Sequence, residues 1–314
     1  MNLQEGYPPN TSYRLTPSCQ RTTHPIMPLN LRVPTSPRRA LSLAAGSLLI
    51  CAATAADTVT LNPVADNTLI QDPAGALSAG ASYNVYSGRV GSNGSGTFRR
   101  ALIRFDLSAI PPGSTVTSVQ LRMYMSQGQG GTRSHALHRM SASWGEAGSF
   151  SFGGAGAPAQ TGDATWIHRS WPGTPWATPG GDFVATPSAT QNVSGIAWYT
   201  WGSTGALVAD VQSWVSLPTQ NFGWMLRGDE SQERTSKRFD SRQSANPSTK
   251  PQLIITFTPP ASNPADINGD GSVNGFDLAA LLGAWGTSAP GPDIDDNGTV
   301  DGLDLAALLA AWTG

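Results

Sequence analysis

Cysteine is nearly absent from this chain, and the only two, Cys19 and Cys51, lie close to its N-terminus. The rest of the chain can form no disulfide, so its fold must depend on an apolar core, with metal binding as a second source of stability. Charged residues are also few, at 13% of the chain, and the formal net charge is −2. Because nucleic-acid binding requires a basic face, the composition argues against a nucleic-acid partner.

The N-terminal part has the pattern of a secretory signal. A pair of arginines precedes an apolar run over residues 40–51, and small residues follow as far as position 56. The run is too short and too rich in small residues for a permanent membrane span. We therefore expect a secreted, extracellular or cell-surface protein that loses residues 1–56, with translation beginning at Met27 and no transmembrane span in the mature chain. A lipid anchor at Cys51 is a weaker alternative, because the residue before it fits a lipobox poorly.

One twelve-residue pattern occurs twice near the C-terminus, over residues 266–277 and again over residues 293–304. Side chains with oxygen atoms stand at positions 1, 3, 5, 9 and 12 of both copies, and glycine stands at position 6. This is the spacing with which an EF-hand loop surrounds Ca²⁺, position 7 adding a backbone carbonyl. The sequence therefore predicts two calcium ions rather than two Asx-rich turns that bind nothing. The predicted ligands are Asp266, Asn268, Asp270, Ser272, Asn274 and Asp277 in the first loop, and Asp293, Asp295, Asn297, Thr299, Asp301 and Asp304 in the second.

An apolar helix is predicted after each loop, because four apolar residues recur there at helical spacing. The two sets are Leu278, Leu281, Leu282 and Trp285, and Leu305, Leu308, Leu309 and Trp312. Prolines before both loops make an entering helix unfavourable, so each unit is a loop with an exiting helix. Two such units in tandem resemble a type I dockerin over roughly residues 264–314.

The dockerin resemblance implies docking to a cohesin-like or other extracellular protein. Loop positions 10 and 11 depart from the family, because they are Gly275-Phe276 and Gly302-Leu303 rather than a hydroxyl or small apolar pair. The helices are almost wholly Ala and Leu and lack the family's Lys or Arg. These departures weigh against a conventional cohesin partner, whereas Asp at position 12 is usual for dockerins.

Residues 57–258 are predicted to form a β domain, because glycine (35) and proline (24) are abundant in the chain and apolar residues alternate in short runs. In the clearest strand, over residues 116–125, one face carries Val119, Leu121, Met123 and Met125. Further strands are predicted over residues 101–107, 136–140, 223–227 and 252–257, and one helix over residues 206–214. Residues 259–265 are interpreted as a linker to the dockerin-like segment, residues 266–314.

This β segment resembles the DNRLRE family, jelly-roll-like sandwich domains related to carbohydrate-binding module family 96. The matching blocks follow the family's order over roughly residues 57–258 and comprise residues 100–111, 116–124, 143–146, 163–166, 176–183, 239–242 and 250–257. The resemblance implies a mainly β, jelly-roll-like β-sandwich that binds carbohydrate or attaches to extracellular polymer. Members often adjoin polysaccharide-degrading domains.

Two kinds of side chain are candidates for contact with a polysaccharide or cell-surface glycan. Trp166, Trp171 and Trp176 recur at five-residue steps, and exposed indoles pack well on the C–H faces of sugars. Arg104 and Arg227 belong to a basic set that could bind an acidic polysaccharide; its other members are Arg99, Arg100, Lys237, Arg238 and Arg242. The alternatives are a packing role for the tryptophans and an ion pair with Asp106 for Arg104.

Catalytic machinery is not evident. Glycoside hydrolysis normally needs two carboxylates across a cleft, and the β segment has only Glu146, Glu230 and Glu233, the last two in a polar loop that we interpret as a solvated turn. His135 and His138 are three apart in a predicted strand, so they should face opposite sides. We therefore predict no catalytic residue and an accessory role in polysaccharide breakdown. A structural surface protein with an anchoring tag, and a glycoside hydrolase or polysaccharide lyase, remain alternatives.

Overall fold

The computed structural model describes residues 55–314, so the predicted signal, the start at Met27 and Cys51 lie outside the described residues. Within residues 55–314, no helix is both long enough and apolar enough to cross a membrane.

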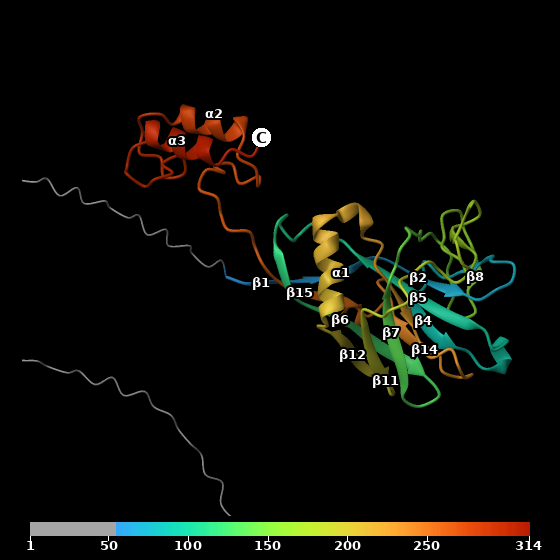
Figure 1. The fold of residues 1–314 in the computed structure, drawn as a ribbon. Coiled ribbons are helices and arrows are strands. Elements are labelled where there is room, and N and C mark those ends of the chain that lie inside the picture. Colours follow the sequence, from blue (N-terminus) through green and yellow to red (C-terminus); the bar gives the residue numbers. More distant parts are fainter. Residues whose placement is uncertain (1–54) are drawn as a thin grey trace, which may run out of the picture. The chain divides into compact units, whose positions relative to one another are not determined.

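The β domain is built on one curled antiparallel sheet of eleven strands, an architecture consistent with a β-sandwich (Figure 1). The path through the sheet is β1 (Asp57–Leu61), β15 (Gln252–Thr258), β6 (Thr115–Gly128), β14 (Lys237–Asp240), β4 (Asn84–Arg89), β5 (Phe98–Phe105), β13 (Trp224–Arg227), β7 (Arg133–Arg139) and β11 (Ala189–Val193). Off this path, β12 (Ala197–Gly202) pairs with β6, and β2 (Pro63–Ile70) pairs with β5.

The sheet turns at strand β4. Residues as far as Ser87 pair with β14, whereas Gly88 and Arg89 pair with β5. Gly88 has a φ of 115°, and a Cβ atom there would lie 2.9 Å from the Cα of Ser236. Only glycine tolerates this conformation and this close approach. A strand that passes between sheet halves in this way lets both halves enclose one core.

The main core lies inside the curl of the sheet. The alternation predicted for β6 is confirmed, since four side chains are no more than 1% exposed: Val119, Leu121, Met123 and Met125. The predicted helix is also confirmed as α1 (Gly205–Ser216), whose buried face contains Leu207, Val211 and Trp214 and packs on this core. Thr204 begins the helix by accepting a hydrogen bond from the Leu207 N–H at 3.1 Å.

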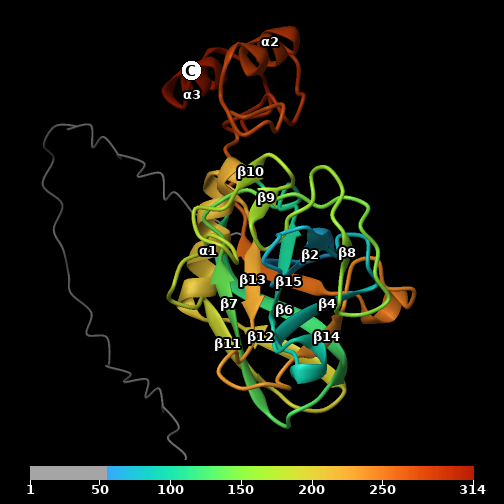
Figure 2. The ribbon, with the colours of Figure 1, turned by 90° about the vertical axis from the view of Figure 1, so that its right-hand side faces the viewer.

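A second apolar cluster covers the opposite face of β2, β5 and β13. Leu69, Leu102 and Met225 from these strands pack against Trp144, Trp166 and Trp176 from long loops. Two short ladders accompany these loops: β3 (Leu77–Ser78) pairs with β8 (Ala157–Pro158), and β9 (His168–Ser170) pairs with β10 (Thr174–Pro175). Strands β8, β9 and β10 are labelled in Figure 2.

The C-terminal segment contains α2 (Gly275–Gly283) and α3 (Gly302–Ala310), so a helix follows each twelve-residue loop as predicted. Asn274 and Asp301 begin these helices, each in a capping box with the Asp three residues later. None of the described helices leads into either loop. Residues that are equivalent in the two repeats form a small core: Val273 and Val300, and Leu281 and Leu308.

Candidate glycan-binding groove and calcium loops

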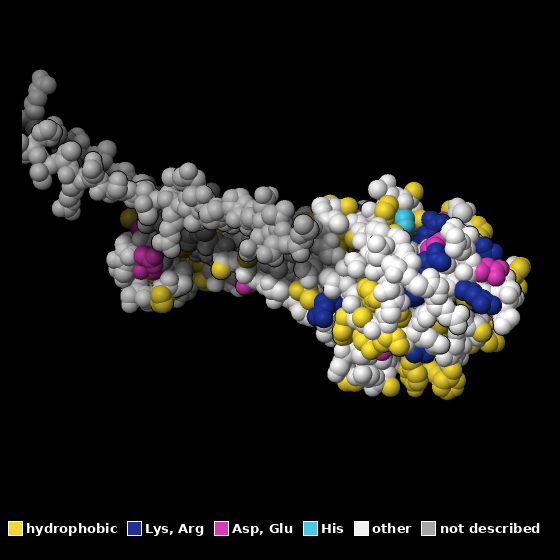
Figure 3. All heavy atoms as spheres, turned by 90° about the horizontal axis from the view of Figure 1, so that it is seen from below, with side chains coloured by type: hydrophobic (Ala, Val, Ile, Leu, Met, Phe, Trp, Pro, Cys, Tyr) yellow, Lys and Arg dark blue, Asp and Glu magenta, His cyan; other side chains and the backbone are white. Residues whose placement is uncertain are grey.

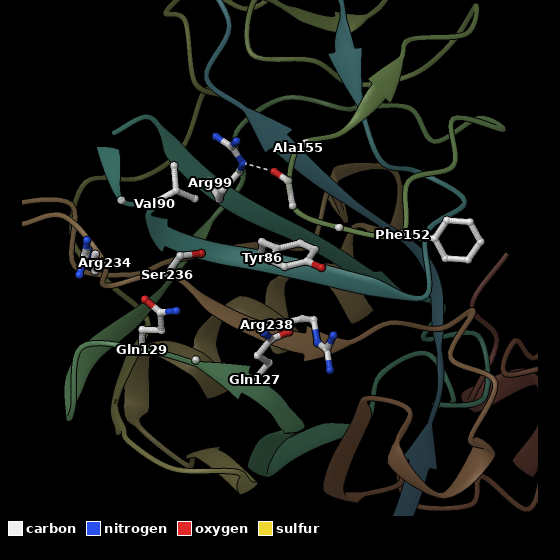
Figure 4. Close-up of a pocket in the computed structure, with 14 residues that line it drawn as sticks. Tyr86, Val90, Arg99, Gln127, Gln129, Phe152, Ala155, Arg234, Ser236 and Arg238 are labelled. Atoms are coloured by element: carbon white, nitrogen blue, oxygen red, sulfur yellow. Dashed lines mark hydrogen bonds between the residues drawn. The ribbon is translucent and has the colours of Figure 1, made fainter. Parts of the chain in front are cut away.

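A groove of about 430 Å³ lies over β4, β6 and β14, on the sheet face opposite the main core (Figure 4). Alternation along the strands explains which side chains reach it, because Val85 and Phe239 point into the core and their neighbours Tyr86 and Arg238 point outward. The strand register pairs Arg238 with Tyr86 on one side and with Gln127 on the other. These three side chains therefore form a row across three strands.

Arginine determines the charge of this groove, which we call the arginine groove. Arg99, Arg234 and Arg238 line it, and none of the described residues that line it is Asp or Glu. Burial lowers the pKa of Arg99 to about 10, so its guanidinium remains protonated at neutral pH. Burial also raises the pKa of Tyr86, against the opposing charge of Arg238, so the phenol stays neutral. A concave cationic surface with polar groups attracts an anionic ligand.

Arg99 and Arg238 belong to the basic set predicted from the sequence, whereas Tyr86, Gln127 and Arg234 do not. Arg238 could be recognised as outward-facing from strand alternation alone. Alternation does not identify Gln127 as a groove residue, because the register between β14 and β6 shifts at a bulge after Arg238.

Two of the tryptophans chosen from the sequence are buried, which does not fit a role in ligand contact. Trp166 is 8% exposed and Trp176 is 4% exposed, and both belong to the cluster under the long loops. The indole N–H of Trp176 donates to the backbone oxygen of Thr165 at 2.9 Å, and the Arg100 guanidinium lies 4.8 Å from the Trp166 ring centre. Large indoles stabilise loops when they are buried in this way. Trp171 is half-buried and lies outside the arginine groove.

Arg104 also lies outside the arginine groove. Its guanidinium is 5.6 Å from the ring centre of Trp144, and it lines a separate cavity of about 640 Å³ beside Trp214. The alternative of an ion pair with Asp106 is not observed, since the Asp106 carboxylate accepts hydrogen bonds from the N–H and hydroxyl of Ser108, each at 3.0 Å.

Arg227 is held by Glu230, and the expectation that Glu230 lies in a solvated turn is wrong. The Glu230 side chain is 8% exposed and accepts hydrogen bonds from Arg100 at 2.7 and 3.0 Å and from Arg227 at 2.9 Å. Burial alone would raise the pKa of Glu230, but the two guanidinium groups hold it below its ordinary value. The polar sequence of the loop does not indicate that the Glu230 carboxylate is buried against two guanidinium groups. On the face seen in Figure 3, acidic side chains lie beside several of the basic ones.

Two further basic residues have structural partners. Lys237 is 1% exposed and donates to the backbone oxygens of Gln129 and Gly131 at 2.8 and 2.7 Å. Arg242 forms an ion pair with Glu146 at 2.9 Å, which joins two of the blocks singled out in the sequence. At the hollow itself, Arg99 is 5% exposed and its guanidinium donates to the backbone oxygens of Gly154 and Phe98. Arg234 and Arg238 are therefore the lining arginines that are more open to solvent.

The two histidines face opposite sides of β7, as predicted. His135 lies against Phe239 of the main core, with a centroid distance of 5.8 Å. His138 lies against Phe183 on the other face, at 5.1 Å, and its Nδ1 is 2.9 Å from the Val184 oxygen. They therefore share no ligand site.

The twelve-residue loops share the main hydrogen bonds that their first and last carboxylates accept. The carboxylate at position 1 accepts from the N–H groups at positions 5 and 6, with distances of 3.1 and 2.8 Å at both Asp266 and Asp293. The carboxylate at position 12 accepts from the N–H groups at positions 3 and 9 in both Asp277 and Asp304. These bonds close both loops, and in the second loop the side chains at positions 1 and 12 converge.

The donor set fits a hard cation such as Ca²⁺. Ligand atoms of Asp293, Asp295 and Asp304 all lie within 4.8 Å of one another. Backbone N–H groups, that of Asp301 first among them, lower the pKa of Asp304 and keep it ionised. At Asp277 burial opposes ionisation, but the N–H groups of Asn274 and Asn268 outweigh it and lower the pKa. Ionised oxygens this close repel one another until a cation is added.

Residues 57–150 match the sequence model of carbohydrate-binding module family 96. The matched range is less than a third of the chain and covers the strands from β1 to β7. It includes Tyr86, Arg99 and Gln127 of the arginine groove, whereas Arg234 and Arg238 lie beyond it. No curated protein matches the chain. The family match supports a carbohydrate-binding module in the β domain.

Proposed function

We propose that this chain is a secreted, non-catalytic protein whose jelly-roll-like β domain binds an acidic polysaccharide in the arginine groove. One observation carries the proposal: Arg234, Arg238 and the more buried Arg99, with no acidic residue among those described, line a hollow on the domain whose residues 57–150 match a carbohydrate-binding family. Tyr86 and Gln127 offer a phenol and an amide beside the charges. Guanidinium groups form bidentate hydrogen bonds with carboxylates or sulfates, and amides form hydrogen bonds with sugar hydroxyls.

The proposal is tested by titrating the whole chain with polyuronate and sulfated polysaccharides, and with neutral glucans of similar length, in a calorimeter. We expect binding to the acidic polymers only, with an affinity that falls as salt is added. Arg238→Ala should weaken binding at least about tenfold, a change of about 1.4 kcal/mol.

Arg122→Ala is the matched control. Arg122 lies on β6 and its guanidinium packs over Trp198 at 4.9 Å, outside the groove. It should bind like the wild type. Equal binding of neutral and acidic polymers, or equal losses in both variants, would contradict an anionic site in the groove.

We further propose that the C-terminal segment is a dockerin-like module that binds two calcium ions through the side chains of its two loops. The convergence of Asp293, Asp295 and Asp304, and the identical hydrogen bonds of the first loop, support this proposal. When bound, the ions would neutralise the crowded carboxylates and so stabilise the loops and the helices that follow them.

Calcium titration of the whole chain checks this proposal, with a stoichiometry of two ions expected. Asp277→Ala and Asp304→Ala should each remove one ion. Asp296→Asn is the control, because this acidic residue stands at loop position 4, which supplies no ligand. Unchanged stoichiometry in both alanine variants would refute the ligand assignment.

The docking role rests on a repeated exposed surface. Six apolar side chains that are equivalent in pairs are at least 42% exposed: Phe276 and Leu303, Leu282 and Leu309, and Trp285 and Trp312. Residues 259–314 contain no Lys, Arg or His. We propose that a cohesin-like or other extracellular protein covers this surface with apolar residues rimmed by basic ones. A structural protein with an anchoring tag would use the same surface but would leave the arginine groove without a glycan.

A further inference from the structure

Three aromatic side chains form an exposed row beside the arginine groove. Tyr83, Phe150 and Phe152 are 46%, 37% and 85% exposed. The ring centres of Tyr83 and Phe150 are 5.2 Å apart, and those of Phe150 and Phe152 are 4.8 Å apart, both edge to face. Exposed aromatic rings that gather in one place leave apolar surface in water, which marks a surface for binding a partner.

The backbone beneath this row is held by buried hydrogen bonds. The N–H of Ser151, between the two phenylalanines, donates to the hydroxyl of Ser82 at 2.9 Å. The N–H of Ala81 donates to the oxygen of Ser149 at 2.8 Å, and the N–H of Gly80 donates to its hydroxyl at 3.0 Å. Ser82 and Ser149 are each 1% exposed. The rings therefore stand on a fixed loop, and little conformational freedom would be lost on binding.

The row continues the arginine groove, because Phe152 lines the groove and contacts Phe150. Figure 4 places Phe152 at one end of the groove and Arg234 at the other, with Tyr86 between them. A second hollow of about 330 Å³ adjoins the Arg234 end and is lined by Asn93 and Gln129. Charged, polar and aromatic surfaces thus follow one another along a single track.

We propose that this aromatic row is an additional binding surface for the same acidic glycan chain, so that the protein binds the interior of a long polymer rather than a single sugar. The arginines would hold acidic groups in the groove, and the next sugars would pack their C–H faces on Phe152 and Phe150. Tyr83 adds a hydroxyl for hydrogen bonding at the far end. The inference rests on the proposed function, since the groove provides the charge that selects the chain.

The test measures affinity against chain length, using the whole protein and uronic-acid oligosaccharides from the disaccharide to the polymer. We expect the wild type to bind long chains more tightly than the disaccharide. Phe150→Ala, at a ring of the row that does not line the groove, should weaken binding of long chains about tenfold and leave disaccharide binding unchanged, and Phe150→Trp should restore it. Ile196→Ala, at an apolar residue of the β domain that is 65% exposed and lines neither hollow, is the matched control and should bind every length like the wild type.

Each outcome separates the two proposals. If Phe150→Ala binds long chains as the wild type does, the aromatic row is not a glycan surface, while the groove proposal stands. A protein partner for the row would give this same result. If Phe150→Ala loses the same factor for the disaccharide and the polymer, the row does not extend the site beyond the groove and the extended track is wrong. If the wild type binds no acidic oligosaccharide of any length, both proposals fail.

Discussion

Replacement of Glu230 by Gln should destabilise the β domain strongly, although the residue lies in a polar loop. The substitution preserves the shape of the side chain and removes the negative charge of the carboxylate with which both Arg100 and Arg227 pair. Breaking a buried ion pair by removing one partner costs about 3–5 kcal/mol. The Arg227 side chain is 39% exposed, so its ion pair with Glu230 contributes little to the free energy of unfolding. In the variant Arg100 keeps its hydrogen bond to the Gly180 oxygen at 2.8 Å. We therefore expect a loss of unfolding free energy at the lower end of this range, about 3 kcal/mol.

The loss can be measured by urea unfolding and by thermal unfolding followed by circular dichroism, where it should lower the melting temperature by about 6–12 °C. Glu233→Gln is the control from the same loop. Glu233 is 42% exposed and lies 3.7 Å from Arg89, so its loss should cost less than about 1 kcal/mol.

The pH dependence provides a second check. Because the folded-state pKa of Glu230 is lowered, its contribution is present at neutral pH and is lost as the pH falls through that lowered pKa. The difference between wild type and Glu230→Gln should therefore shrink in acid. Equal stability of the two proteins at neutral pH, or a difference that persists undiminished in acid, would refute the reasoning.

Two further predictions concern buried groups. Burial raises the pKa of Asp66 to about 8, although the N–H of Arg242 opposes this shift. The free energy of unfolding of the wild type should therefore fall as the pH rises from about 4 to about 8. Asp66→Asn should flatten this dependence, which urea unfolding at several pH values can measure. A slope unchanged by the substitution would show that another group causes it. Trp166→Ala should lower the free energy of unfolding by about 3–5 kcal/mol in the same assay, because the indole fills the cluster under the long loops. A loss below about 1 kcal/mol would mean that the ring is not packed.

Local patterns were sufficient for several elements of this fold. The alternation at Val119, Leu121 and Met123 identified β6 and its buried face, because side chains on a strand alternate whatever its neighbours are. The spacing of Leu207 and Val211 identified α1 in the same way. The sequence likewise determined that a helix follows each twelve-residue loop, since capping residues and apolar spacing are both local.

Only the tertiary structure decided which polar and aromatic side chains meet. Tyr86, Gln127 and Arg238 lie far apart in the sequence and come together through strand pairing and a bulge, neither of which is visible in local periodicity. Burial depends equally on distant chain segments. Trp176 is buried by loops, whereas Phe152 is exposed beside the groove, although both are aromatic residues in Gly-rich segments. Composition and spacing describe what a residue can do, but the pairing of remote strands and loops determines whether it reaches solvent, a partner charge or a ligand.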